Sequence, residues 1–181
     1  MKKITLFLSF LLIGAVAFTV IGKKSSTPRP SQEPREIREQ RRAARQAAME
    51  KMIDSIVLAK AFQFMPNTMQ QNPAGNMQML SNANFEVGIW NGSADIFLPY
   101  IKGIVPPYRH TILNYTISDL QNYTTEQMDN GWRVSFNSGL YSASTYTFIF
   151  EINSKFGTTN LSLKNQWYNT VQYTGTIMQY Y

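Results

Sequence analysis

The feature that most constrains the fold is a period-two alternation of apolar and polar residues that begins near residue 61. Short runs rich in aromatic and β-branched residues follow this pattern, and Gly, Asn, Asp and Pro separate them. Successive side chains of a β-strand point to opposite faces, so each run predicts a strand with one buried face. We therefore expect a mainly β domain over 61–181, an antiparallel meander of about eight strands. The strands would form a sandwich or a partial barrel, and a lipocalin-like barrel is one form of such closure.

One hairpin of this domain can be predicted down to its register. Asn91-Gly92 favours the two positive φ values of a type I′ turn, and alternating runs flank the pair. The predicted cross-strand pairs are Trp90 with Ser93, Ile89 with Ala94, Val87 with Ile96 and Phe85 with Leu98. Upstream, we expect a first strand that ends before Pro66 and a loop over 67–75, because this stretch holds Pro73, Gly75 and several amide side chains.

The first 60 residues have a different composition. Residues 1–22 combine Lys2 and Lys3 with an apolar run and small residues, the pattern of a secretory signal peptide. The run is also about long enough to be retained as a membrane anchor, and we favour cleavage. Residues 23–34 are rich in Ser and Pro and predict a flexible linker. Residues 35–60 lack Gly and Pro and predict a basic amphipathic helix, with Met49, Met52, Ile53, Ile56 and Val57 on one face.

Composition and charge exclude several classes of function. The chain has no Cys and a single His, His110, which removes thiolate sites, disulfides and multi-histidine metal sites. The net charge of +6 lies in the N-terminal segments, because Ser55 to Tyr181 holds six basic and six acidic residues. A neutral domain gives no support to nucleic-acid binding. We expect no metal and no cofactor, and His110 is interpreted as a surface residue.

The order of several short segments resembles a known family. These segments are Phe62-Gln63-Phe64, Phe97-Leu98-Pro99-Tyr100, Gly131-Trp132-Arg133-Val134-Ser135-Phe136 and Val171-Gln172-Tyr173-Thr174-Gly175-Thr176-Ile177. Together with the N-terminal signal and helix, they resemble the Domain of Unknown Function 4251 family, small exported proteins of Bacteroides-type bacteria. The resemblance covers roughly residues 49–177 and implies an exported β-rich domain in the periplasm or outer envelope of a Gram-negative bacterium. It implies no activity, and the glycine-rich stretch of the family is replaced here by 106–110.

A candidate ligand site lies on the outward face of the predicted hairpin. Glu86 and Asp95 are diagonal neighbours there, within roughly 8 Å of each other, and Trp90 shares the face. Two carboxylates beside an aromatic ring suit a lectin-like sugar site or a glycoside hydrolase. The alternative is an ordinary solvated hairpin face. The domain has more aromatic residues than a core of this size needs. We therefore expect several tyrosines to be exposed, namely Tyr100, Tyr108, Tyr168, Tyr180 and Tyr181. Of these, Tyr100 and Tyr108 are added to the candidate ligand site.

These observations lead to three hypotheses. We favour a noncatalytic binding module of the cell envelope, for a small apolar or glycan ligand. The first alternative is a structural or assembly protein that docks a partner, an envelope protein or a lipid surface, through Arg41, Arg42 and Arg45 of the helix. The second alternative is a glycan-processing enzyme that uses Glu86 and Asp95.

Overall fold

The structure is a computed structural model that describes residues 35–73, 75–140 and 144–180. The signal peptide predicted for 1–22 and the linker predicted for 23–34 lie outside the described residues. The chain from Arg35 onward forms one compact unit.

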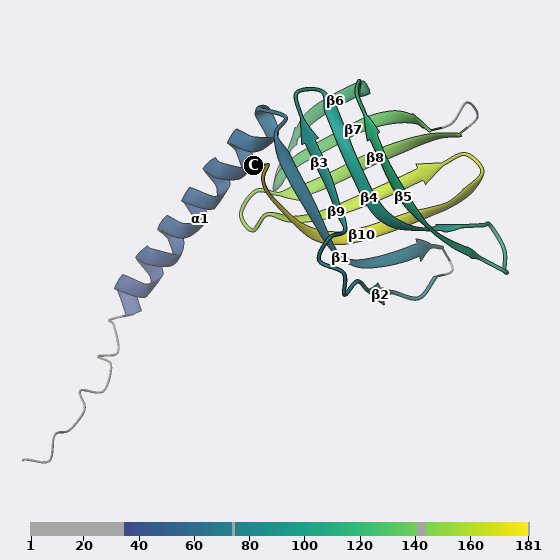
Figure 1. Cartoon of the computed structure of the whole chain (residues 1–181). Helices are drawn as coiled ribbons and strands as arrows, with labels where there is room; N and C mark the ends of the chain where they lie inside the picture. The colour runs from purple at the N-terminus through teal and green to yellow at the C-terminus, as the bar shows by residue number, and fades with distance from the viewer. Residues whose placement is uncertain (1–34, 74, 141–143, 181) are drawn as a thin grey trace, which may run out of the picture. The chain divides into compact units, whose positions relative to one another are not determined.

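The predicted helix is α1, Arg35–Leu58, two residues shorter than expected (Figure 1). Lys60 follows it with a φ of 53°, the left-handed conformation that ends many helices. Only the last turns are buried, at Ile53, Ile56 and Val57, whereas Met49 and Met52 of the predicted apolar face are exposed. The helix therefore docks on the β domain by its C-terminal end. Among the described residues, no helix has both the length and the apolar character needed to cross a membrane.

Ten strands form one antiparallel sheet. They are β1 (Phe62–Asn72), β2 (Gln78–Met79), β3 (Glu86–Trp90), β4 (Ser93–Lys102), β5 (Arg109–Ile117), β6 (Gln121–Met128), β7 (Gly131–Leu140), β8 (Ser144–Asn153), β9 (Thr158–Asn165) and β10 (Tyr168–Gln179). The sheet order is β5-β4-β3-β1-β10-β9-β8-β7-β6, and β2 pairs with β1. The first strand thus lies between two meanders, β3–β5 and β6–β10.

The sheet curls into a half-barrel, so the expected mainly β class and partial barrel are confirmed (Figure 1). The two edge strands β5 and β6 are consecutive in the chain, and three residues join them. A backbone hydrogen bond from Leu120 N to Gly92 O, 2.9 Å long, fixes this connection to the β3–β4 turn. The two faces of the half-barrel differ, because alternate residues of the strands are buried and exposed. One face encloses the core, and the other faces solvent.

Aromatic side chains dominate the interior. Phe150 is fully buried, and the edges of the Phe62 and Phe64 rings contact it with centroid distances of 5.7 Å. Phe136 stacks on Phe148 at 4.8 Å. Edge-to-face and offset pairs of this kind add to the stabilisation that burial supplies. The alternating apolar positions of β7, β8, β9 and β10 lie in this core, from Trp132 to Ile177.

The structure confirms three of the four cross-strand pairs predicted for the β3–β4 hairpin. Trp90 pairs with Ser93, Ile89 with Ala94 and Val87 with Ile96. Phe85 is the exception, because β3 begins one residue later, at Glu86. The Phe85 ring packs on Phe97 at 5.4 Å. The turn has the expected positive φ values, 49° at Asn91 and 78° at Gly92.

The prediction that the first strand ends before Pro66 and that 67–75 form a loop is wrong, because β1 continues through Pro66 to Asn72. Pro66 pairs with Gly175, and the register shifts between Pro66 and Thr68, which marks a β-bulge. A bulge tolerates a residue that cannot donate a backbone hydrogen bond. Gly175 completes the arrangement, since a Cβ there would lie 2.0 Å from Met65 O. The short β2, which pairs with β1, was also not predicted.

Candidate functional site

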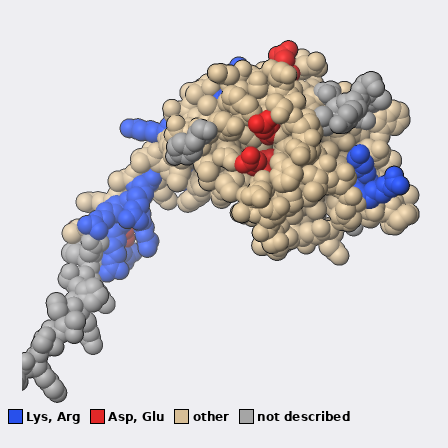
Figure 2. Space-filling model, in the orientation of Figure 1, with Lys and Arg blue, Asp and Glu red and all other residues tan. Residues whose placement is uncertain are grey.

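The outward face of the β3–β4 hairpin carries Glu86, Trp90 and Asp95, as the alternation predicted. Glu86 pairs with Phe97, and Asp95 pairs with Gly88, one step along the hairpin. Both carboxylates have partners on neighbouring strands. Gln63 Nε2 donates to Glu86 Oε2, and Thr116 Oγ1 donates to Asp95 Oδ1. Figure 2 shows isolated acidic side chains on a mainly uncharged surface of the β domain.

The chain's own C-terminal region covers this face. The Tyr180 ring stacks on Trp90 with a centroid distance of 4.7 Å and an interplanar angle of 15°. It also lies on Gly88, where a Cβ would come within 2.5 Å of Tyr180 Cε2, so the glycine makes room for the ring. Desolvation, with smaller contributions from the negative charges of Asp95 and Glu86, raises the pKa of Tyr180 above its ordinary value. A ligand that stacks on Trp90 must therefore displace Tyr180.

The expected exposure of Tyr100 is wrong. Its side chain is 0% exposed, and its ring edge packs on Tyr146 at 5.4 Å. Tyr100 extends the alternation of Ile96 and Leu98 on β4, so it points into the half-barrel. Burial raises its pKa, and the neighbouring tyrosines add to the shift. Tyr100 thus belongs to the core and is separated from Glu86 and Trp90 by the sheet.

The remaining tyrosines divide between the core and the surface. Tyr173 is fully buried and donates from its hydroxyl to Pro99 O at 2.6 Å. Tyr108 is half-buried and lies against Gly103 in the connection between β4 and β5, away from the hairpin face. Tyr168 and Tyr180 are also half-buried, and Tyr181 lies outside the described residues. The five residues proposed as one ligand site are therefore not brought together.

Arg41, Arg42 and Arg45 lie on the exposed first half of α1. Figure 2 shows the basic side chains of this helix as a continuous blue surface. His110 is exposed on β5, where it pairs with Ile101. Nothing in this placement joins the single histidine to Glu86 or Asp95.

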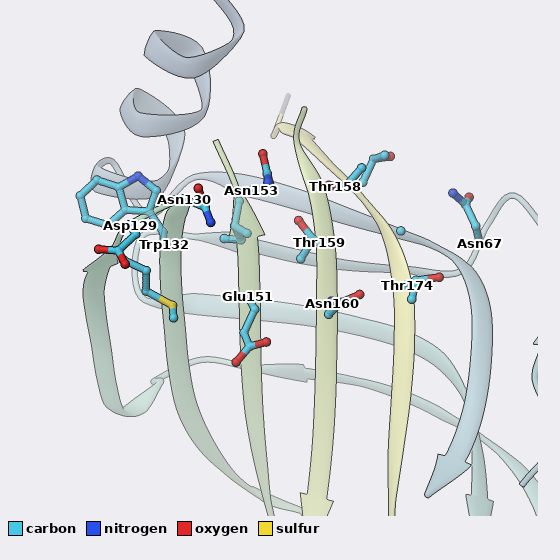
Figure 3. A pocket seen from close by; sticks show the side chains of 15 residues that line it. Asn67, Asp129, Asn130, Trp132, Glu151, Asn153, Thr158, Thr159, Asn160 and Thr174 are labelled. Carbon is cyan, nitrogen blue, oxygen red and sulfur yellow. The ribbon is translucent and has the colours of Figure 1, made fainter. Parts of the chain in front are cut away.

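A cavity of about 640 Å³ lies on the outer face of the sheet, over β7 to β10 and β1 (Figure 3). Eight of its fifteen lining residues carry amide or hydroxyl side chains, and Trp132 lies at one side (Figure 3). Figure 3 shows these residues spread over neighbouring strands, from Trp132 on β7 to Asn67 on β1. The polar lining residues are Asn67, Asp129, Asn130, Glu151, Asn153, Thr158, Thr159, Asn160, Thr174 and Thr176.

Two charged side chains line this cavity, Asp129 and Glu151. Glu151 accepts a hydrogen bond from Arg133 Nη2 at 2.9 Å, which offsets its charge. Asn160 and Thr174 are exposed on adjacent strands and pair in register. The cavity therefore offers many neutral donors and acceptors and little net charge.

Backbone contacts and the end of α1 shape the cavity. Gly131 has a φ of 149°, and a Cβ there would lie 2.0 Å from Ile152 O, so β7 and β8 approach closely. Behind Gly131, Trp132 Nε1 donates to Asp54 Oδ1 at 2.7 Å, and Ser154 Oγ donates to the same oxygen at 3.1 Å. One helix carboxylate thus fixes the Trp132 side chain and the turn after β8.

Sequence reasoning missed this cavity. The alternation does show Thr158, Asn160, Thr174 and Thr176 at outward positions, which is a weak signal for a polar strand face. The pairing of β10 with β1 could not be predicted, and this pairing brings Asn67 to the same surface.

The fold is that of a mainly β protein, an antiparallel half-barrel with one N-terminal helix. Residues 44–177 match the family described as Domain of unknown function (DUF4251), and the chain belongs to that family. The match confirms the resemblance found in the sequence.

A solved structure supports the same fold. The crystal structure of a DUF4251 family protein from Bacteroides eggerthii DSM 20697 superposes with a TM-score of 0.57 at 13% identity. The similarity covers 74% of this chain and 91% of that one. The comparison with curated proteins gives no match.

Proposed function

We propose that this protein is an exported, noncatalytic binding module whose ligand is a neutral glycan. The observation that carries the proposal is the outer-face cavity, in which eight of the fifteen lining residues carry amide or hydroxyl side chains. Its volume of about 640 Å³ falls within the usual size of small-molecule sites, roughly 300–1,000 Å³. A sugar presents hydroxyl groups that both donate and accept hydrogen bonds, and Asn and Thr side chains match both roles.

The interior favours a glycan over a small apolar ligand. Phe62, Phe64, Phe136, Phe148 and Phe150 fill the space that a lipocalin-like barrel uses for an apolar ligand. An apolar ligand would have to replace these packed rings. The outer cavity is open to a polar ligand without such a rearrangement.

The cellular part of the proposal rests on the sequence. The apolar run after Lys2 and Lys3 supports export, and the family resemblance supports the periplasm or outer envelope of a Gram-negative bacterium. Fractionation of the producing cells, with the mass of the recovered protein, tests this part. A full-length chain in the cytoplasmic fraction would contradict it.

The binding proposal is tested by affinity electrophoresis and calorimetry against soluble neutral polysaccharides, with dextran, xylan and galactomannan as probes. Asn160→Leu removes an amide from the centre of the cavity and should weaken binding about tenfold, the equivalent of one or two hydrogen bonds. Asn114→Leu is the matched control, because Asn114 is an exposed strand asparagine outside the cavity. Equal binding by wild type and Asn160→Leu, or no binding to any probe, would refute the glycan proposal.

The glycan-processing alternative uses a different surface. Glu86 and Asp95 lie on the outer face of β3 and β4, where the Tyr180 ring covers Trp90 and Gly88. The partners Gln63 and Thr116 already engage both carboxylates, which favours a structural role. Unchanged polysaccharide hydrolysis in a Glu86→Gln, Asp95→Asn double variant would exclude this pair as the catalytic acids.

One observation favours the assembly alternative as a second candidate. Residues 35–52 of α1 are exposed, including Arg41, Arg42 and Arg45, so about three quarters of the helix presents a surface to solvent. Deletion of residues 35–48 should abolish co-purification of such a partner and leave the β domain folded, as circular dichroism would report. Unchanged co-purification would argue against docking through this helix.

A further inference from the structure

The connection between β4 and β5 carries an exposed apolar tip. Ile104 and Val105 are 62% and 70% exposed, and Pro106 and Pro107 follow them. Trp167, in the turn between β9 and β10, is 59% exposed. We call these five residues the apolar tip. Single exposed apolar residues are common on soluble proteins, whereas a continuous group at a loop end marks an interaction surface.

Hydrogen bonds join the two loops of the tip at their base. Gly103 O accepts from Gln71 Nε2 at 2.9 Å and from Asn169 N at 3.4 Å. Asn169 Nδ2 also donates to Ile104 O at 3.1 Å. Gln71 is 1% exposed, so this anchor lies in the core. The backbone of the tip is thus held in place, while its apolar side chains remain outside.

Basic residues follow directly behind the tip. Lys102 and Arg109 are paired in the β4–β5 register, at the last ladder position before the loop, and His110 comes next. Residues 96–118 and 152–181, which supply both loops of the tip, contain no Asp or Glu. Figure 2 shows a group of basic side chains on the β domain at the end away from α1.

This combination fits the surface of an anionic bilayer. Exposed aliphatic side chains can enter the boundary between headgroups and acyl chains, and cations just behind them meet the lipid phosphates. Tryptophan is enriched at headgroup level for the same reason. A protein partner would have to combine an apolar socket with an acidic rim, whereas an anionic membrane supplies both features at once.

We propose that the apolar tip docks the β domain on an anionic phospholipid membrane. Ile104 and Val105 enter the interface, Trp167 lies among the headgroups, and Lys102 and Arg109 contact phosphates. The contact is small and carries two cations, so the binding is reversible and sensitive to salt.

The test uses the purified chain with vesicles of phosphatidylcholine alone or with about 30% phosphatidylglycerol, whose anionic headgroups give the bilayer a negative surface potential. Co-sedimentation measures binding, and brominated lipids quench tryptophans that enter the bilayer. Trp167→Phe identifies the part of the quenching that belongs to Trp167. The chain is used without residues 1–22, the predicted signal peptide, because their apolar run would itself insert into the bilayer and mask the contribution of the tip.

The double variant and its control leave the net charge unchanged. The double variant Ile104→Ser, Val105→Ser should lower the partition coefficient for anionic vesicles about tenfold or more, because it removes the inserting side chains without adding charge. Arg109→Gln should lower it about fivefold. Ile112→Ser is the control, because Ile112 is 53% exposed on β5 and lies outside the tip. It should bind as the wild type does.

Three results would overturn the proposal. The first is equal binding by the wild type and the double variant. The second is the absence of Trp167-dependent quenching in anionic vesicles. The third is a dimer in the absence of lipid that the double variant loses, because that result assigns the tip to a second copy of the chain. Circular dichroism of each variant checks that the fold is retained.

Discussion

The strongest prediction concerns Asp54, whose carboxylate joins α1 to the β domain. Asp54 Oδ1 accepts from Trp132 Nε1 at 2.7 Å and from Ser154 Oγ at 3.1 Å, and both donors lie on residues that are at most 9% exposed. Asp54→Ala leaves these buried donors without their acceptor. An unsatisfied buried donor costs about 1–3 kcal/mol, so we expect the free energy of unfolding to fall by roughly 2–3 kcal/mol in total.

Urea unfolding, followed by circular dichroism and tryptophan fluorescence, measures this loss. For a chain of this size it corresponds to a fall in Tm of about 4–12 °C. Asp54→Asn retains a carbonyl oxygen as acceptor and should lose about half as much. Glu50→Ala is the control, because Glu50 is exposed one turn earlier on the same helix. Its unfolding free energy should stay within about 0.5 kcal/mol of the wild type.

A double-mutant cycle with Trp132→Phe separates the hydrogen bond from other effects. The coupling energy between Asp54 and Trp132 should be about 1 kcal/mol or more, since they are in direct contact. A coupling energy near zero, or a stability loss below about 0.5 kcal/mol for Asp54→Ala, would refute the view that this carboxylate anchors the helix.

Three further predictions concern the aromatic residues. Burial raises the pKa of Tyr100 and Tyr173 above the ordinary value of 10.0. Above about pH 10 the folded form therefore holds protons that the unfolded form has lost. The contribution of these two groups to stability is constant below about pH 10 and falls as the pH rises further, by about 1.4 kcal/mol per pH unit for each group, until the folded form also loses its proton. Absorbance at 295 nm and circular dichroism should change together, and titration of all tyrosines near pH 10 in the folded state would contradict this. Gly88→Ala should displace the Tyr180 ring and alter the near-ultraviolet circular dichroism at a cost below about 1.5 kcal/mol; an unchanged spectrum would count against the stacking. Phe150→Ala should lower the unfolding free energy by about 3–5 kcal/mol, measured in urea, and a loss below 1 kcal/mol would mean that the core is not packed as described.

Much of the local structure could be predicted because it depends on neighbouring residues. Asn91-Gly92 determines a two-residue turn, and that turn sets the pairs of the β3–β4 hairpin. The same alternation would have placed Tyr100 in the core, in phase with Ile96 and Leu98. The large number of aromatic residues led to the wrong interpretation, although strand phase is the stronger signal.

The rest depends on pairings between distant parts of the chain. Pro66 is a local signal for the end of a strand, and only the approach of Gly175 makes the bulge at that position possible. The cavity needs β7 to β10 and β1 to lie side by side, and the stacking of Tyr180 on Trp90 needs the chain end to return to the first hairpin. No periodicity within a single segment encodes these contacts.

The place of β1 in the sheet has a consequence for how the chain acquires its structure. Phe62 pairs with Gln179, so the first strand of the domain finds its partner in the last one. Contacts between residues so far apart in sequence close large loops and make folding slow. The sheet can be completed only after synthesis has reached the final strand. Until then β1 presents an unpaired edge, and a truncation that removes β10 would leave that edge without its main partner.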